Sequence, residues 1–198
     1  MFEQLLKMRE QAKINGEPIL RNKSFELLIE KVKCFKPKKI LEIGVNLGLS
    51  GIAMLLTSTE SVLTGIEIDE EKIVLAKNNY KYFDVYDRAK IFQGDASEII
   101  PILTGNYDFI FLDGPKGHYF EYLPHLLSIL NVGGILFADN VLFRGYVGDK
   151  VKTPHRFATT KHSMENFLNA ITTDESLATE IIDIEDGISI TKKIIWKR

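Results

Sequence analysis

The feature that most constrains the fold of this chain is a regular alternation of short apolar runs with amphipathic stretches. The apolar runs lie near residues 39–44, 62–68, 89–93, 108–113 and 134–139, and the helical patterns between them lie near 49–57, 70–83, 96–103 and 117–130. Buried parallel strands read as nearly continuous apolar runs, and alternation with helices is typical of βαβ units. The sequence therefore predicts an α/β fold built on a largely parallel sheet.

Further elements are expected on both sides of this core. Two helices come first, one stopping at Asn15-Gly16 and the other ending before Pro37. After the core, a helix at about 161–173 precedes strands at 180–184 and 188–195. Asp186-Gly187 lies between these last two runs, and Asp-Gly in that position is a strong hairpin signal. We expect the last two strands to be antiparallel.

A glycine turn follows the first predicted strand. Gly44 and Gly48 permit a tight turn and close approach of a ligand, but their spacing differs from the G-x-G-x-x-G of dinucleotide sites. Glu67 ends the second strand about 20 residues later, where a carboxylate can accept hydrogen bonds from both ribose hydroxyls. Together these features favour an adenosyl ligand. The alternative is that the glycines only form a turn and that Glu67 or Asp69 caps a helix.

Two later strands end in acidic residues, Asp113 and Asp139-Asn140. Ligands of open α/β sheets bind at the carboxyl ends of the strands, so chemistry is expected at both positions. Each dipeptide taken alone is also compatible with a simple turn or a cap.

The motifs that carry these features resemble those of the metal-dependent O-methyltransferases related to catechol and caffeoyl-CoA methyltransferases. The resemblance covers nearly the whole chain, in order, through Leu41-Glu42-Ile43-Gly44, Gly65-Ile66-Glu67-Ile68-Asp69, Gly94-Asp95-Ala96, Asp113-Gly114-Pro115-Lys116-Gly117-His118-Tyr119 and Asp139-Asn140-Val141-Leu142-Phe143. It implies a Rossmann-like, seven-stranded class I methyltransferase sheet with helices on both faces and a C-terminal antiparallel hairpin. It also implies one domain over residues 1–198, in which the helices of residues 1–36 form a lid or dimer contacts.

The same resemblance implies S-adenosylmethionine as the cofactor. Glu42, Gly44 and Ser50 would hold its methionine part, and Glu67 its ribose. Asp95-Ala96 would lie at the adenine edge, and Asp113 near both cofactor and metal. The implied cofactor-binding set is completed by Leu20 and Val45.

The metal prediction also follows from ligand chemistry. Asp113, Asp139 and Asn140 offer only oxygen atoms, which suits a hard divalent ion such as Mg²⁺, with Mn²⁺ or Ca²⁺ as alternatives, and disfavours zinc. An acceptor with two adjacent oxygens could chelate this ion, which would lower the pKa of one hydroxyl for attack on the sulfonium methyl.

Lys116 and Asp113 are the predicted catalytic residues. In the family pattern a lysine at the position of Lys116 removes the hydroxyl proton, and a nearby cation would lower the pKa of that lysine. This chain has Gly114-Pro115 where relatives often carry small residues such as alanine, and the proline fixes the backbone just before Lys116. His118 lies near the site and is left unassigned.

Composition limits the remaining possibilities. A formal net charge of -2 gives no global attraction to nucleic acid or anionic membranes. Cys34 is the single cysteine, which excludes an intramolecular disulfide and a thiolate zinc cluster, and we expect a buried thiol. No run approaches the roughly 20 apolar residues of a membrane span, and the charged N-terminus lacks a signal-peptide core, so a cytoplasmic protein is expected.

The acceptor is predicted from a basic loop. Residues 144–161 carry Arg144, Lys150, Lys152, Arg156 and Lys161, with Asp149 as their only acid, and could hold phosphates. Pro18-Ile19-Leu20 and the terminal hairpin are similar to the bacterial branch that methylates 5-hydroxyuridine at the tRNA wobble position. We therefore favour tRNA over a small catechol or phenol, and the relatives suggest a homodimer. A nucleotide-binding oxidoreductase and a non-catalytic binding protein are the remoter alternatives.

Overall fold

The structure is a computed structural model that describes residues 1–148 and 150–195. The chain divides into two compact units, residues 1–96 and 97–198, and each is described by itself. The single-domain organisation expected from the sequence stays a prediction. Within the described residues, no helix has the length and apolar character that crossing a membrane requires.

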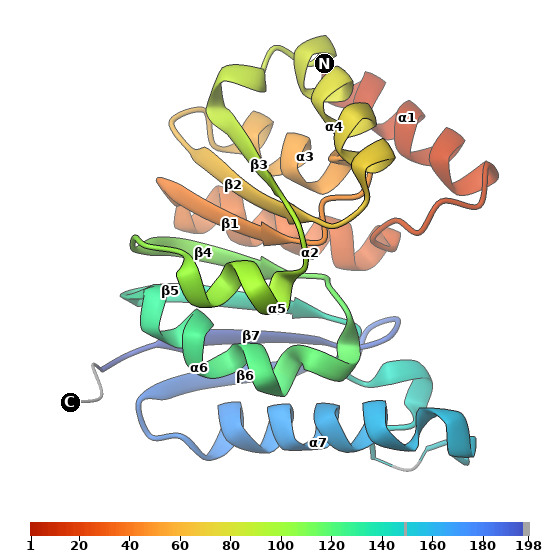
Figure 1. Cartoon of the computed structure of the whole chain (residues 1–198), viewed down its shortest axis with the longest axis vertical. Coiled ribbons are helices and arrows are strands. Elements are labelled where there is room, and N and C mark those ends of the chain that lie inside the picture. The colour runs from red at the N-terminus through yellow and green to blue at the C-terminus, as the bar shows by residue number, and fades with distance from the viewer. Residues whose placement is uncertain (149, 196–198) are drawn as a thin grey trace. The chain divides into compact units, whose positions relative to one another are not determined.

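The first unit is a three-stranded parallel sheet with helices packed against it. Its strands lie in the order β3-β2-β1, with Lys39 opposite Val62 and Leu63 opposite Ala89. Helix α3 contacts α2, α1 and α4, and α4 packs along β2 and β3 (Figure 1). In chain order the elements are α1 (Phe2–Ile14), α2 (Asn22–Phe35), β1 (Lys39–Ile43), α3 (Leu49–Thr57), β2 (Val62–Glu67), α4 (Glu70–Tyr82), η1 (Tyr86–Arg88) and β3 (Ala89–Gln93).

Local sequence explains where these elements begin and end. The buried stripe of α2 comes from Phe25, Leu28 and Val32, which share one face at helical spacing. The helix ends at Lys36, which adopts a left-handed conformation with φ of 50° immediately before Pro37. Helix α4 begins after Asp69, whose carboxylate accepts the backbone N–H groups of the first turn.

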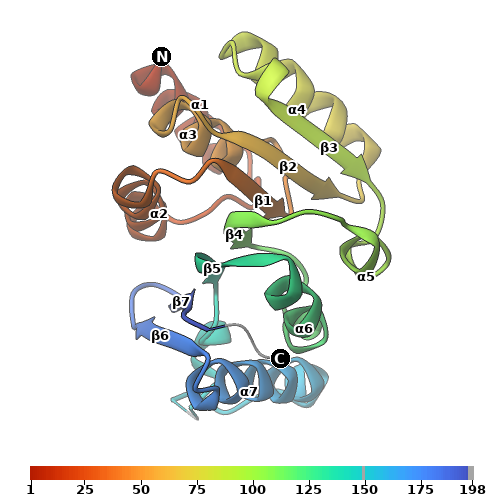
Figure 2. The same cartoon turned by 90° about the vertical axis from the view of Figure 1, so that its left-hand side faces the viewer.

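The second unit contains a mixed sheet in the order β4-β5-β7-β6. Strands β4 and β5 are parallel, whereas β7 pairs antiparallel with both β5 and β6, so the predicted terminal hairpin is confirmed. Helices α6 and α7 pack against each other, and α7 covers β6 (Figure 2). The elements are α5 (Ala96–Ile99, at the boundary between the units), η2 (Ile100–Ile102), β4 (Tyr107–Leu112), η3 (Lys116–His118), α6 (Tyr119–Ile129), β5 (Leu130–Asp139), η4 (Phe143–Gly145), η5 (His155–Phe157), α7 (Ala158–Thr173), β6 (Leu177–Ile182) and β7 (Ile188–Lys193).

Three sequence-based expectations were wrong in detail. Strand β6 spans Leu177–Ile182 rather than 180–184. Strand β5 begins at Leu130 rather than 134, because the chain bulges at Gly133 and the register with β4 shifts between Tyr107 and Phe109. Cys34 is exposed rather than buried, since it lies on the side of α2 away from the buried stripe. The position of a bulge in a strand depends on tertiary packing, which the local sequence pattern does not indicate.

A buried tyrosine fixes the carboxyl ends of β4 and β5. Tyr119, at the start of α6, is fully buried. Its hydroxyl lies 3.0 Å from the carbonyl oxygen of Leu112 and 3.3 Å from that of Asp139, and its single proton is shared between them. Burial and the charges of Asp113 and Asp139 raise the pKa of Tyr119 well above its ordinary value, so the hydroxyl stays a donor.

We expect Tyr119→Phe to lower the free energy of unfolding by about 1–3 kcal/mol, because two buried carbonyl groups lose their shared donor. Urea denaturation of the purified variant measures this loss. Tyr82→Phe removes an exposed hydroxyl and is the matched control, for which we expect no change. Equal midpoints for wild type and Tyr119→Phe would contradict the assigned role.

Candidate active site

The first half of the predicted site is the turn after β1. Gly44 and Gly48 have φ angles of 89° and 75°, a left-handed region in which glycine is strongly favoured. A Cβ atom at Gly48 would also lie 2.8 Å from the ring of Tyr80, so this position needs a glycine for space as well. The backbone N–H of Gly44 donates to Ile66 at 3.0 Å, which places the turn beside the end of β2.

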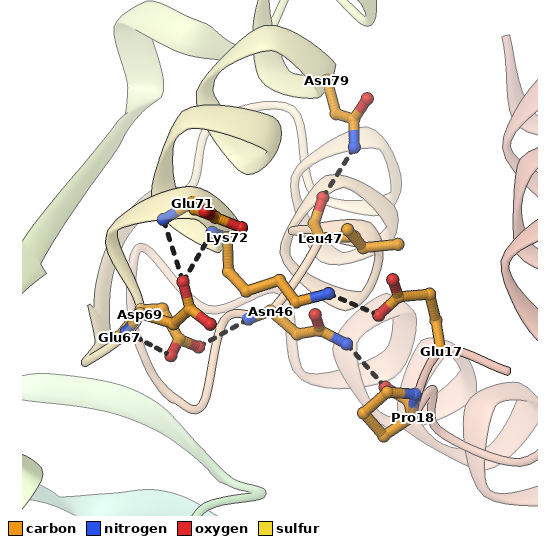
Figure 3. Close-up of polar contacts among 9 residues, drawn as sticks. All are labelled: Glu17, Pro18, Asn46, Leu47, Glu67, Asp69, Glu71, Lys72 and Asn79. Carbon is orange, nitrogen blue, oxygen red and sulfur yellow. Dashed lines mark hydrogen bonds and ion pairs between the residues drawn. The ribbon is translucent and has the colours of Figure 1, made fainter. Parts of the chain in front are cut away.

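Glu67 lies at the centre of a backbone hydrogen-bond network. Its Oε2 accepts the N–H of Asn46 at 2.8 Å, and its Oε1 accepts that of Asp69 at 3.0 Å (Figure 3). Its Oε1 also accepts the N–H of Ile68 at 2.9 Å. These bonds fix the carboxylate, and each oxygen has two lone pairs, so acceptor capacity remains for a ligand hydroxyl. Asp69, by contrast, caps α4, as the alternative interpretation of that residue predicted.

Glu42 is placed differently from the other predicted cofactor residues. Its side chain is fully buried. A Cβ atom added to Gly51 of α3 would lie 2.6 Å from both Glu42 Oε2 and the Tyr80 hydroxyl, so these two groups meet over that glycine. Burial and the Glu42 carboxylate raise the pKa of Tyr80 well above its ordinary value. Glu42 therefore contributes a buried acidic group beneath the glycine turn.

The remaining predicted cofactor residues of the first unit come from several segments: Leu20 precedes α2, Val45 follows β1, and the others are in or beside α3 and α5. Leu20 and Val45 are buried, Ser50 is half-buried in the first turn of α3, and Asp95 is exposed after β3. Ala96 is buried at the start of α5. The N–H of Gly94 donates to the backbone carbonyl oxygen of Glu67 at 2.9 Å, which brings the ends of β3 and β2 together.

The second half of the predicted site is an acidic pair after β4 and β5. Leu112 and Ala138 are paired across these parallel strands, so Asp113 and Asp139 follow at adjacent positions. Asp139 is 3% exposed, and its Oδ1 is buried without a hydrogen-bond partner. Burial and the negative charge of Asp113 raise the pKa of Asp139 to about 7, against the opposing effects of Lys116 and of the Asn140 N–H. The charge of Lys116 therefore offsets only part of the effect of burial and of Asp113 on Asp139.

Lys116 is directed at this pair. It begins η3, and its Nζ lies 2.7 Å from Asp113 Oδ1 despite the intervening Gly114-Pro115. Both side chains are about a quarter exposed, at 21% and 24%. His118 instead pairs with Glu121 at 2.8 Å and stacks on the ring of Tyr122. Its recorded contacts are therefore with α6 and not with the acidic pair.

Asn140 is held by the terminal hairpin. It adopts a φ of 56°, and the next two residues donate their N–H groups to the carbonyls of Gly187 and Asp186 at 3.0 and 2.9 Å. Gly187, at φ 81°, accommodates the side chain of Leu142, which would lie 2.3 Å from an added Cβ atom. The hairpin turn thus positions the backbone that carries the third predicted metal ligand.

The basic loop is organised around aromatic rings. Phe143, Tyr146 and Phe157 pack with centroid separations of 5.5–5.6 Å, and the guanidinium groups of Arg144 and Arg156 lie 5.5 and 4.7 Å from the Phe157 centroid. Two lysines of the loop pair with acids, Lys150 with Asp183 and Lys161 with Glu165. Asp149 lies outside the described residues.

Sequence reasoning missed two residues that organise these half-sites. Asn46 received no predicted role, although its side chain donates to the carbonyl oxygen of Pro18 and its N–H to the carboxylate of Glu67. Tyr119 was quoted only as part of a motif. The available signal for Asn46 was its place between two turn glycines. The signal for Tyr119 was its place shortly after an acid that ends a strand. Neither signal indicates which distant carbonyl the side chain reaches.

Residues 1–148 and 150–195 contain no group of three or more histidine, cysteine or acidic side chains placed to hold a metal. The predicted set has two carboxylates and relies on the amide of Asn140 for its third ligand.

Comparisons with known proteins cover nearly the whole chain. The caffeoyl-CoA O-methyltransferase of Stellaria longipes is 28% identical over 177 residues, which is 85% of this chain and 73% of that protein. Tapetum-specific methyltransferase 1 of Arabidopsis thaliana is 29% identical over 170 residues, or 83% of this chain and 73% of its own.

Solved structures agree with the fold. The crystal structure of a putative caffeoyl-CoA O-methyltransferase from Staphylococcus aureus matches with a TM-score of 0.87 and 26% identity, covering 96% of this chain and 91% of that one. An SAH-bound methyltransferase of Podospora anserina, PaMTH1, matches with a TM-score of 0.84 at 22% identity, covering 96% and 87%. The predicted seven-stranded methyltransferase fold with its antiparallel terminal hairpin is confirmed.

The family assignment is equally direct. The sequence pattern of the family described as O-methyltransferase matches residues 1–194. The recognition of this family from the sequence is confirmed, and so is the prediction of an O-methyltransferase, whereas the bacterial tRNA branch is not. The chain belongs to the O-methyltransferase family.

Proposed function

We propose that this protein transfers a methyl group from S-adenosylmethionine to a small phenolic acceptor with two adjacent oxygen atoms, with the help of a divalent cation. The observation that carries the proposal is the acidic pair at the ends of β4 and β5. Asp139 is buried beside Asp113 with an unpartnered Oδ1 and a raised pKa. Buried carboxylates in that condition are stabilised by a bound cation.

The donor set supports a hard divalent metal. Asp113, Asp139 and Asn140 would hold it through oxygen atoms, and Mg²⁺, Mn²⁺ and Ca²⁺ all accept such ligands. When bound, the ion supplies positive charge that lowers the pKa of an acceptor hydroxyl.

The first unit supplies the groups for the cofactor. Glu67, fixed by three backbone N–H groups, is the proposed acceptor for the ribose hydroxyls. Gly44, Val45 and Ser50 are proposed to contact the methionine part, with the buried acid Glu42 favouring its positive charge. We propose that the rest of the S-adenosylmethionine molecule is contacted by Leu20, Asp95, Ala96 and Asp113.

The reaction is a direct displacement. The acceptor oxygen attacks the methyl carbon, the new C–O bond forms as the C–S bond breaks, and S-adenosylhomocysteine leaves as a neutral thioether. The hydroxyl proton must pass to a base, and Lys116 is our proposed recipient, because a cation bound by Asp113 would replace the ion pair that Lys116 Nζ makes with Asp113 Oδ1 and would favour the uncharged amine. Accepting that proton requires the neutral amine.

A small acceptor is favoured over tRNA. Caffeoyl-CoA O-methyltransferases are prominent among the relatives, and the loop that suggested RNA uses Arg144 and Arg156 against an aromatic ring and Lys150 in an ion pair. Lys152 and the exposed edges of both arginines keep 5-hydroxyuridine of tRNA as the second candidate. The homodimer stays a prediction.

Methyl transfer from labelled S-adenosylmethionine tests the proposal. A panel of catechols and, separately, tRNA lacking the wobble modification would be incubated with Mg²⁺ or with EDTA. We expect label in a catechol, with Mg²⁺ only. Label in tRNA alone would select the second candidate, and equal transfer in EDTA would contradict a metal-assisted reaction.

Asp139→Asn removes a charge while keeping the side-chain volume. We expect a fall in turnover of about a hundredfold or more, because a predicted metal ligand loses its charge, and little change in affinity for S-adenosylhomocysteine. Asp87→Asn, at an exposed acid of the first unit, is the matched control and should keep full activity. Wild-type turnover in Asp139→Asn would contradict the assigned role of the acidic pair.

A further inference from the structure

The segment between α1 and α2 lies against the predicted cofactor turn. Residues 15–21 form this segment, here called the strap. The carbonyl oxygen of Pro18 accepts a hydrogen bond from Asn46 Nδ2 at 2.7 Å (Figure 3). Asn46 lies between the two glycines of the turn, so this bond joins the strap to the carboxyl end of β1.

A second fastening joins the strap to α4. Lys72 Nζ lies 2.6 Å from Glu17 Oε2, and each side chain is 26% exposed. Lys72 is in the first turn of α4, where its own N–H is held by the capping carboxylate of Asp69. Figure 3 shows the Lys72 side chain extending from that turn to the strap. The pair is partly shielded from water, which distinguishes it from a solvated surface contact.

The far end of the strap is also anchored. Arg9 of α1 is 2% exposed, and its Nη2 donates to the carbonyl of Leu20 at 2.7 Å. The guanidinium lies 3.5 Å from the centroid of the Phe25 ring. The strap is thus held at Glu17, Pro18 and Leu20 by side chains from three different parts of the first unit.

The fastenings converge on the proposed ribose-binding carboxylate. The N–H of Asn46 donates to Glu67 Oε2, while its side chain holds Pro18. Lys72 follows Glu67 by five positions, through the cap of α4. Asn79 of α4 donates to the carbonyl of Leu47 at 2.9 Å and steadies the same turn. One residue, Asn46, therefore links the strap directly to Glu67.

We propose that Asn46, Glu17 and Lys72 are positioning residues that couple closure of the strap to retention of the adenosyl ligand. The inference rests on the proposed function, because it takes the glycine turn and Glu67 as the cofactor site. With the strap fastened, Asn46 holds Glu67 and the turn in one arrangement. With the strap released, the turn loses its support, and the bound cofactor dissociates faster.

Reciprocity makes the coupling measurable from the other direction. If strap closure favours the ligand, the ligand must favour strap closure by the same factor. Backbone amides of residues 16–21 should therefore exchange with deuterium more slowly when S-adenosylhomocysteine is bound. A purely structural strap would show the same exchange with and without the ligand.

Two variants break the Asn46 and Lys72 fastenings one at a time, and a third variant keeps the charge at Lys72. Asn46→Gly removes the side-chain amide but keeps the N–H to Glu67 and tolerates the observed φ of 49°. Lys72→Met breaks the ion pair, and Lys72→Arg preserves its charge. Calorimetric titration with S-adenosylhomocysteine gives the affinity, and stopped-flow displacement gives the dissociation rate. We expect Asn46→Gly and Lys72→Met to weaken binding about three- to tenfold through faster dissociation, and Lys72→Arg to restore most of it.

Lys7→Met is the matched control, because it breaks the exposed pair with Glu3 on α1 and should leave binding unchanged. Thermal melting of each ligand-free variant checks that it is folded. Wild-type affinity and dissociation in folded Asn46→Gly and Lys72→Met would overturn the inference while leaving the proposed function intact. Failure of the wild-type protein to bind S-adenosylhomocysteine would instead overturn the proposed function.

Discussion

The acidic pair of Asp113 and Asp139 is the constraint around which the second unit is organised. Parallel pairing of β4 and β5 places both carboxyl groups at adjacent strand ends, and their repulsion together with burial raises the pKa of Asp139 to about 7. The surrounding chain maintains this arrangement: Tyr119 shares its proton between the two strand ends, and the terminal hairpin holds the backbone after Asn140. This close pairing of two acidic groups is the observation on which we base the proposed cation site.

In the first unit, by contrast, the carboxylate of Glu67 is stabilised by hydrogen bonds from backbone N–H groups. Glu67 accepts three N–H groups, one of them from Asn46 in the glycine turn, and so fixes the relative positions of two strand ends. A network of this kind is pre-organised before a ligand arrives, which reduces the entropy lost on binding. The strap extends the same network to the N-terminal helices through Glu17 and Lys72. Whether these helices act as a lid or as dimer contacts stays a prediction.

The sequence predicted the element order and the strand ends that carry the proposed site residues, because these depend on local signals. Apolar runs ending in an acid give the strand ends, and Asp186-Gly187 gives the hairpin. Cys34 was misplaced although the apolar stripe of α2 lies on the opposite face, because cysteine was taken as a buried residue type without regard to its place in the helical period. The roles of Asn46 and Tyr119 were missed because their partners lie 28 and 20 residues away in the chain. Long-range hydrogen bonds leave no periodic trace in a sequence.

The central claim is that the acidic pair binds a divalent cation, and direct metal titration tests it without any assumption about the acceptor. Electron paramagnetic resonance of Mn²⁺ would be recorded with wild-type protein, Asp139→Asn and the exposed-acid control Asp87→Asn. The account predicts that wild type and Asp87→Asn bind Mn²⁺ equally and that Asp139→Asn binds it at least about tenfold more weakly. Equal Mn²⁺ affinity in all three proteins, or no binding by the wild type, would contradict it.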